Sequence, residues 1–337
     1  MTRQDRLSAD LDRGFAALEA GEFAAAEACV ERCRRIDRQN PDVVLLGAAL
    51  ADARGELDEA LAQYREVAEL RPDDAMPRIC VARLELHHAG DPDAALETVE
   101  AAFELIDEEA DLVEAVVVRT EALLAIGDTE NARSSLAELA SSVIDDGELA
   151  LDLGELALAA EDPGGAARWA EIAQHTPALR ADALHLLGRI HEARDERTEM
   201  IAAWQQVREL DAAAPPGPVS ISDDELERIA LDTLAELPAD VRARLENVPI
   251  LIDGAPSQDQ VADGLDPRLL GLFQGTPMPE GSSAVPSVTN IVLYRTNLER
   301  AASDLDHLAE EVRITVLHET AHYFGLDEDD LEKLGLD

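Results

Sequence analysis

The chain has 337 residues, enough for about two or three domains, and 46% of them are hydrophobic, enough to fill compact cores. Its 72 acidic residues outnumber 28 basic ones and give a net charge of −44 at pH 7. Such a negative field repels phosphate backbones and anionic lipid, so neither nucleic-acid binding nor membrane binding is expected. A cationic partner is one interpretation of the excess charge, and a solvated acidic surface is the simpler one.

The three cysteines, Cys29, Cys33 and Cys80, do not form the framework of a disulfide-rich protein. Cys29 and Cys33 share one face of a predicted helix, but packing explains them more simply than metal binding. The first residues lack the apolar core of a signal peptide, and no apolar run reaches membrane-spanning length. A cytoplasmic location is therefore expected.

A helical repeat of 34 to 37 residues extends through the first two thirds of the chain. The residue that follows each expected turn between helices is small in five units and methionine in the sixth: Ala26, Ala60, Ala95, Ala132, Ala166 and Met200. Turn glycines stand five residues earlier in the first four units, at Gly21, Gly55, Gly90 and Gly127. The period predicts about five or six pairs of helices.

Twelve residues before these positions a second small residue recurs, at Gly14, Ala48, Gly154 and Gly188, with Arg83 and Thr120 as departures. Small residues let two helices approach closely. With its period, this pattern resembles the tetratricopeptide repeat (TPR) family over about residues 7–212. The resemblance implies an all-α solenoid whose concave groove binds a protein or peptide substrate or an adaptor. A spacer or a dimerisation surface is the alternative.

The period ends at a run of alanines and prolines, and residues 213–221 are predicted to be a stiff, Pro-rich linker. The sequence thus predicts repeats over 1–212, the linker over 213–221 and a second domain over 222–337.

The second domain mixes helices with strands. Ser222 and Glu225 form the pattern of a capping box, which predicts a helix that ends near Leu237. Runs rich in β-branched residues predict strands over 248–252 and 288–294. The other expected elements are a short helix that starts at Asp266 and Pro267 and ends near Gly271 or Gly275, a loop over 277–286, a helix over 304–324 and a final short helix from about 329.

The helix predicted over 304–324 carries the sequence His318-Glu319-Thr320-Ala321-His322. Residues four apart lie on one face of a helix, so His318 and His322 can both bind one Zn²⁺. Glu319 is placed to accept a proton from a water molecule as the general base. The alternative is a solvent-facing helix whose two histidines bind nothing.

A catalytic zinc site has three protein ligands and one open position. Gly325 lets the chain turn directly after the helix, and an acidic run follows it. Glu328 is the predicted third ligand, because its offset from His322 is that of the third histidine in metzincins. Asp327 and Asp329 remain alternatives.

Beyond this motif, residues 222–337 resemble a family of small bacterial zincin-like metallopeptidases. The features that carry the resemblance are the helix with Leu237 and Pro238, the strand after residues 246–248, and the segments 265–275, 291–295 and 316–325. It implies a minimal α+β zincin fold, with a few strands packed on the active-site helix. That family usually has Asp where this chain has Glu328, which leaves the zinc affinity open.

The sequence therefore predicts a zinc-dependent metallopeptidase domain that follows a TPR-like array, and the array would recruit a substrate or partner. Zn²⁺ would polarise the scissile carbonyl, and Glu319 would move a proton from the water to the leaving amine. Tyr294, Arg295 and Tyr323 are candidates for oxyanion or substrate contact, with packing or a surface salt bridge as the alternative. The strand predicted over 288–294 is also a candidate to pair with an extended substrate.

A non-catalytic TPR interaction protein with a structural or degenerate zinc module is the alternative function. Glu319 favours the enzyme, because a purely structural site needs ligands but no general base. The sequence does not indicate the substrate.

Overall fold

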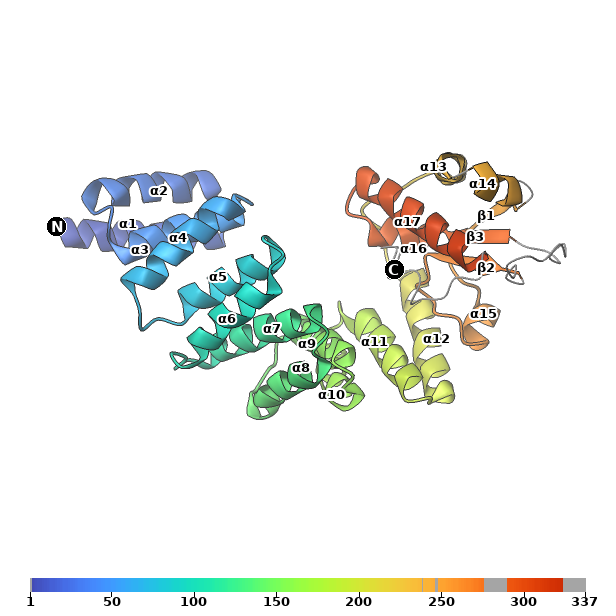
Figure 1. The fold of residues 1–337 in the computed structure, drawn as a ribbon, viewed down its shortest axis with the longest axis horizontal. Coiled ribbons are helices and arrows are strands. Elements are labelled where there is room, and N and C mark those ends of the chain that lie inside the picture. Colours follow the sequence, from blue (N-terminus) through green and yellow to red (C-terminus); the bar gives the residue numbers. More distant parts are fainter. Residues whose placement is uncertain (1, 238, 246–247, 276–289, 324–337) are drawn as a thin grey trace. The chain divides into compact units, whose positions relative to one another are not determined.

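The computed structural model describes residues 2–237, 239–245, 248–275 and 290–323 (Figure 1). Its internal contacts divide the chain into two units, Met1–Thr176 and Pro177–Asp337. In the described ranges no helix is both long enough and apolar enough to cross a bilayer.

The first unit is a stack of helical hairpins. Its elements are α1 (Arg3–Glu19), α2 (Phe23–Ile36), α3 (Pro41–Ala53), α4 (Leu57–Leu70), α5 (Met76–His87), α6 (Pro92–Phe103), α7 (Glu109–Ala125), α8 (Thr129–Ala137), η1 (Glu138–Ser141), α9 (Gly147–Ala159) and α10 (Pro163–Ala173). Each odd-numbered helix pairs with the next even-numbered one, and each hairpin packs against the following hairpin. The predicted helical repeat is confirmed.

The turn within each hairpin needs a residue with a left-handed backbone. Four of these positions are the predicted turn glycines, with φ between 66° and 78°. In the fifth and sixth hairpins the same position holds Glu161 (φ 54°) and Asp195 (φ 61°), although side chains disfavour this conformation. The period therefore identifies the turn even where the glycine is missing.

The small residues of the repeat lie where two helices meet most closely. Ala26, Ala60, Ala95, Ala132 and Ala166 have no exposed surface. A Cβ atom on Gly14 would lie 2.4 Å from Leu46 Cδ2, and one on Gly188 would lie 2.0 Å from Trp204 Nε1. Any larger residue at these two glycine positions would require Leu46 or Trp204 to shift.

The two departures from the pattern are accommodated by polar contacts. Arg83 forms an ion pair with Asp52. The hydroxyl of Thr120 donates to the carbonyl of Val116 at 2.7 Å and lies 3.1 Å from Ser135 Oγ. All three cysteines are buried thiols, which agrees with a packing role.

The second unit begins with one more hairpin and continues into an α+β domain. Its elements are α11 (Arg180–Ala193), α12 (Arg197–Ala213), α13 (Asp223–Glu236), α14 (Ala239–Leu245), β1 (Ile250–Asp253), α15 (Gln258–Ala262), β2 (Gly271–Gln274), β3 (Asn290–Tyr294), α16 (Arg295–Ala301) and α17 (Leu305–Tyr323). The sheet has the order β1-β3-β2, with β1 parallel and β2 antiparallel to β3. The predicted fold class, a helical solenoid followed by a small α+β domain, is confirmed.

The core of the second unit lies between this sheet and two long helices. Ile291 and Leu293 of β3 pack with residues of α13 and α17 such as Leu226 and Val312. Three helices of the second unit were not predicted, namely α14, α15 and α16. The loop predicted over 277–286 and the helix predicted from 329 lie outside the described residues.

The short helix predicted from Asp266 and Pro267 is wrong. Asp266 Oδ1 instead accepts the N–H of Arg268 at 2.7 Å, which closes a tight turn. The chain then enters β2, which gains backbone hydrogen bonds with β3. The capping prediction is only half right: Ser222 Oγ accepts the N–H of Glu225 at 3.3 Å, while the carboxylate of Glu225 contacts Arg228.

The segment predicted as a stiff linker packs into the second unit. Val219 and Ile221 belong to its core, and the Ile221 N–H donates to Glu299 Oε1 at 2.9 Å. The division by contacts, after Thr176, thus differs from the predicted boundary at residue 213. That the boundary at residue 213 separates two independently folding parts stays a prediction.

A pair of fragments tests where the folding unit begins. We expect fragment 177–337 to fold and fragment 222–337 to be less stable, because the shorter one loses Val219 and Ile221, whose burial contributes about 1.5–3 kcal/mol each. Urea denaturation followed by circular dichroism measures the difference. Equal free energies of unfolding would restore the boundary at residue 213.

Candidate active site

The helix α17 (Leu305–Tyr323) is continuous through His318, Glu319 and His322, as predicted. Asp304 caps its first turn, where Oδ1 accepts the N–H of His307 at 2.8 Å. Leu308, Val312 and Val316 recur every four residues and lie in the core. The adjoining stripe, Thr315 and Glu319, faces β2.

Glu319 is a buried carboxylate with a backbone partner. It is 7% exposed, and its Oε2 accepts the N–H of Phe273 at 2.6 Å. A hydrogen bond from a backbone amide to a charged carboxylate is among the stronger ones, and it fixes the orientation of the acceptor. The amide of Phe273 therefore holds the predicted general base against β2.

The approach of β2 to α17 requires a glycine. A Cβ atom on Gly271 would lie 2.5 Å from Thr315 Cγ2 and 3.2 Å from Glu319 Cγ. The sequence analysis placed Gly271 at a possible helix end and included Gly271 and Phe273 in the segment that carries the family resemblance, but it gave neither residue a role at the site. An isolated glycine within a strand-like apolar run is the signal that points to close backbone approach.

The candidates for oxyanion or substrate contact lie in different surroundings. Tyr294 is fully buried, and its hydroxyl accepts a hydrogen bond from Gln260 Nε2 at 3.0 Å. Burial raises the pKa of Tyr294, and the negative charges of Asp253 and Glu319 raise it further. The hydrogen bond from Gln260 lowers the pKa of Tyr294 but does not offset these effects, so the pKa lies above its ordinary value.

Arg295 points to another part of the domain. Its Nη1 lies 2.5 Å from Asp223 Oδ1 at the start of α13. The side chains of Tyr323 and His322 lie outside the described residues. The roles of Tyr294, Arg295 and Tyr323 stay predictions.

The idea that the strand predicted over 288–294 pairs with an extended substrate is wrong. That strand is β3 (Asn290–Tyr294), which lies between β1 and β2 and is paired on both sides. Its backbone therefore has no edge to offer.

The donor types of the site suit zinc. Two imidazoles one helical turn apart match the borderline character of Zn²⁺, which prefers nitrogen and sulfur over oxygen-only sites. Gly325, Glu328 and the alternatives Asp327 and Asp329 lie outside the described residues. Within the described part of the chain, no group of three or more potential ligands comes together.

Comparison with known families identifies the second domain. Residues 245–336 match the profile of the zincin-like metallopeptidases. This segment is a zincin-like metallopeptidase domain. The match includes β1, β2, β3 and α17, and typical members of such families bind zinc. No curated protein matches the chain.

Solved structures resemble the helical repeats. PilW, a type IV pilus biogenesis factor, is 16% identical, with 60% of this chain and 92% of PilW covered and a TM-score of 0.52. PilF of Pseudomonas aeruginosa is 14% identical, with 63% and 95% covered and a TM-score of 0.51. A thermophilic TPR protein of Thermus thermophilus is 19% identical, with 57% and 98% covered and a TM-score of 0.42. The array thus shares its fold with PilW and PilF.

Substitution of Gly271 tests the contact between β2 and α17. In Gly271→Ala the added methyl group collides with Thr315 and Glu319, and we expect a loss of about 1–3 kcal/mol in the free energy of unfolding. Gly254→Ala is the matched control, because its Cβ would lie 3.7 Å from the nearest atom, Thr296 Oγ1. Urea denaturation measures both, and equal stability of the two variants would contradict the close approach.

Proposed function

We propose that the chain is a zinc-dependent metallopeptidase that hydrolyses peptide bonds and whose TPR-like array recruits a protein or peptide. The observation that carries this proposal is the buried carboxylate of Glu319, held by the N–H of Phe273 next to His318. A structural zinc site would need the ligands but not this oriented carboxylate. The zincin-like family match supports the same reaction class.

In this mechanism His318, His322 and Glu328 would hold the metal. When bound, Zn²⁺ supplies a Lewis acid that acidifies a water molecule and polarises the substrate carbonyl. Glu319 takes the proton from the attacking water and delivers it to the leaving amine. The N–H of Phe273 keeps the carboxylate in one orientation, so little reorganisation is needed when the proton moves.

A groove in the first unit supports recruitment of a protein or peptide. It lies between α7 and the start of α9 with the segment before it, has a volume of ≈ 530 Å³, and is lined by apolar residues that include Val113, Val117 and Ile144. Carboxylates such as Glu114 and Asp145 line it as well.

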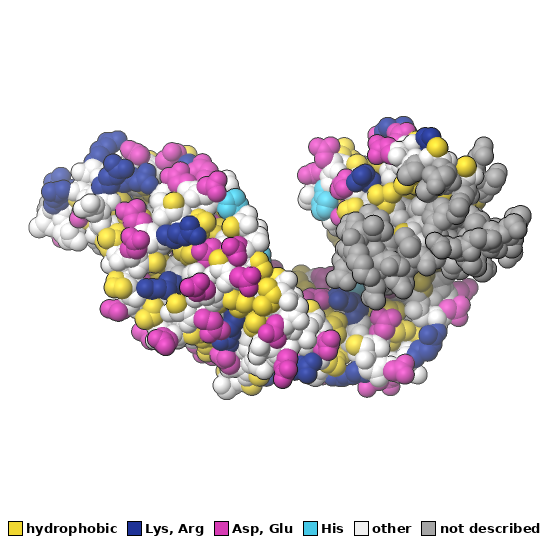
Figure 2. Space-filling view, viewed as in Figure 1, with side chains coloured by type: hydrophobic (Ala, Val, Ile, Leu, Met, Phe, Trp, Pro, Cys, Tyr) yellow, Lys and Arg dark blue, Asp and Glu magenta, His cyan; other side chains and the backbone are white. Residues whose placement is uncertain are grey.

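Figure 2 shows acidic side chains scattered over the visible face of this unit rather than gathered in one patch, which suits a solvated acidic surface.

Replacing the general base separates catalysis from metal binding. In Glu319→Gln the amide cannot relay a proton, so we expect kcat to fall by about 10²–10⁴-fold with zinc content unchanged. A proteome-wide cleavage screen with the wild type supplies substrates, and the variant is then assayed on them. A variant that cuts as fast as the wild type would contradict the mechanism. A zinc-loaded wild type that cleaves nothing would favour the non-catalytic interaction protein.

Metal analysis tests the ligand set. We expect about one zinc ion per chain in the wild type and a strong loss in His318→Ala and in Glu328→Ala, because each removes one of three ligands. Asp327→Ala and Asp329→Ala are the matched controls and should keep their zinc. Loss of zinc in Asp329→Ala but not in Glu328→Ala would move the third ligand to Asp329.

A further inference from the structure

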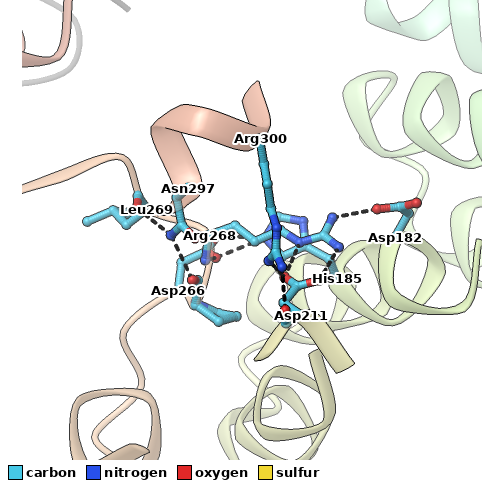
Figure 3. Close-up of polar contacts among 9 residues, drawn as sticks. Asp182, His185, Asp211, Asp266, Arg268, Leu269, Asn297 and Arg300 are labelled. Atoms are coloured by element: carbon cyan, nitrogen blue, oxygen red, sulfur yellow. Dashed lines mark hydrogen bonds and ion pairs between the residues drawn. The ribbon is translucent and has the colours of Figure 1, made fainter. Parts of the chain in front are cut away.

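A cluster of partly buried charges joins the last helical hairpin to the loop that leads into β2 (Figure 3). At its centre, Arg268 forms a forked contact with Asp211 of α12: Nε lies 3.0 Å from Oδ2, and Nη2 lies 3.2 Å from Oδ1. Its Nη1 also donates to Asp182 Oδ1 of α11 at 2.6 Å. The guanidinium of Arg268 thus links the loop that carries it to both helices of the hairpin.

Further contacts fix the same loop from both sides. His185 of α11 lies 2.9 Å from both carboxylate oxygens of Asp266. The side-chain amide of Asn297 donates to the carbonyls of Pro267 and Leu269 at 2.9 and 2.7 Å. Burial alone would raise the pKa of Asp266, but His185 and the N–H of Arg268 lower it below its ordinary value. Asp266 therefore stays charged within the cluster.

Apolar packing and polar contacts hold this loop together. Leu270 packs against the hydrophobic core of the unit. A cavity of ≈ 270 Å³ adjoins the cluster, and Arg268, Leu270 and Asn297 are among the residues that line it. Beside this space the polar contacts of Arg268 and Asn297 restrain the loop. A forked contact restricts geometry more than a single ion pair does, and lysine cannot reproduce it.

The loop is continuous with the strand that holds the general base. Leu270 follows Arg268 by two residues, and its carbonyl accepts the N–H of Tyr294 at 2.8 Å. The chain then passes Gly271 and reaches Phe273, whose N–H donates to Glu319. Phe273 thus lies only three residues beyond Leu270, where this loop ends.

We propose that Arg268 is a positioning residue for Glu319, and that the hairpin of α11 and α12 acts as an integral part of the peptidase domain. By holding residues 266–270, Arg268 keeps β2 at the distance from α17 at which the Phe273 amide meets the carboxylate. The catalytic consequence rests on the proposed peptidase function, whereas the mechanical link between Arg268 and Phe273 does not.

Hydrogen exchange on the full chain measures that mechanical link without a substrate. In Arg268→Ala we expect amides of residues 270–274 to exchange at least about tenfold faster, while those of β1 and of α1 to α10 keep their rates. Arg268→Lys keeps the charge but loses the forked contact, so its exchange rates in 270–274 should lie between those of the wild type and of Arg268→Ala. Arg228→Ala is the matched control, because the ion pairs that Arg228 forms within the described residues, with Glu225 and Asp232 on α13, are exposed.

Two exchange results would overturn the proposal. Unchanged exchange in 270–274 would mean that Arg268 does not hold β2. Faster exchange throughout residues 177–323 would mean that Arg268 stabilises the whole unit and positions nothing in particular. If Arg268→Ala does not fold, Arg268→Lys and Asp182→Asn decide between these results, since each removes only part of the cluster.

Kinetics then test the catalytic consequence on a substrate found with the wild type. We expect Arg268→Ala to keep its zinc and its KM while kcat falls by about tenfold or more, because a small misplacement of a catalytic group is costly. Unchanged kcat with faster exchange in 270–274 would overturn the positioning role. If the wild type cleaves nothing, the peptidase function fails, and the exchange data still decide whether Arg268 controls Phe273.

Discussion

The approach of β2 to α17 is the constraint on which the candidate site depends. Glycine at 271 allows it, since a Cβ there would lie 2.5 Å from Thr315. The same approach that buries Glu319 also supplies the N–H of Phe273 as its partner. A buried carboxylate without a donor would cost several kcal/mol or become protonated, and could then not act as a base. The contact between β2 and α17 therefore determines both the burial of Glu319 and its hydrogen bond.

Three carboxylates fix local geometry where the last hairpin meets the loop before β2. Asp182, Asp211 and Asp266 meet arginine or histidine side chains between two layers of structure. Ion pairs of this kind add little net stability compared with apolar packing, but they fix geometry. Here they define where residues 266–270 lie, and this position determines where β2 begins.

The parts of the fold that repeat could be predicted from the sequence, and the parts set by tertiary pairing could not. The helical period located the hairpin turns even at Glu161 and Asp195, because the other units define the pattern. α17 was predictable from its apolar periodicity and its motif. β2 was missed because Asp266 and Pro267 form a local helix-start signal, which pairing with β3 overrides. Phe273 was missed because a backbone N–H leaves no trace in side-chain type.

A general base held by a backbone amide depends on the position of a strand rather than on the identity of its residues. Many side chains at position 273 would supply the same N–H, but only one placement of β2 brings it to Glu319. That placement is determined upstream, by a loop anchored on α11 and α12. An isolated fragment that begins at residue 222 keeps His318 and Glu319 but lacks the anchors. Loss of activity in such a fragment would therefore reflect the missing hairpin and would carry no information about the chemistry of the site.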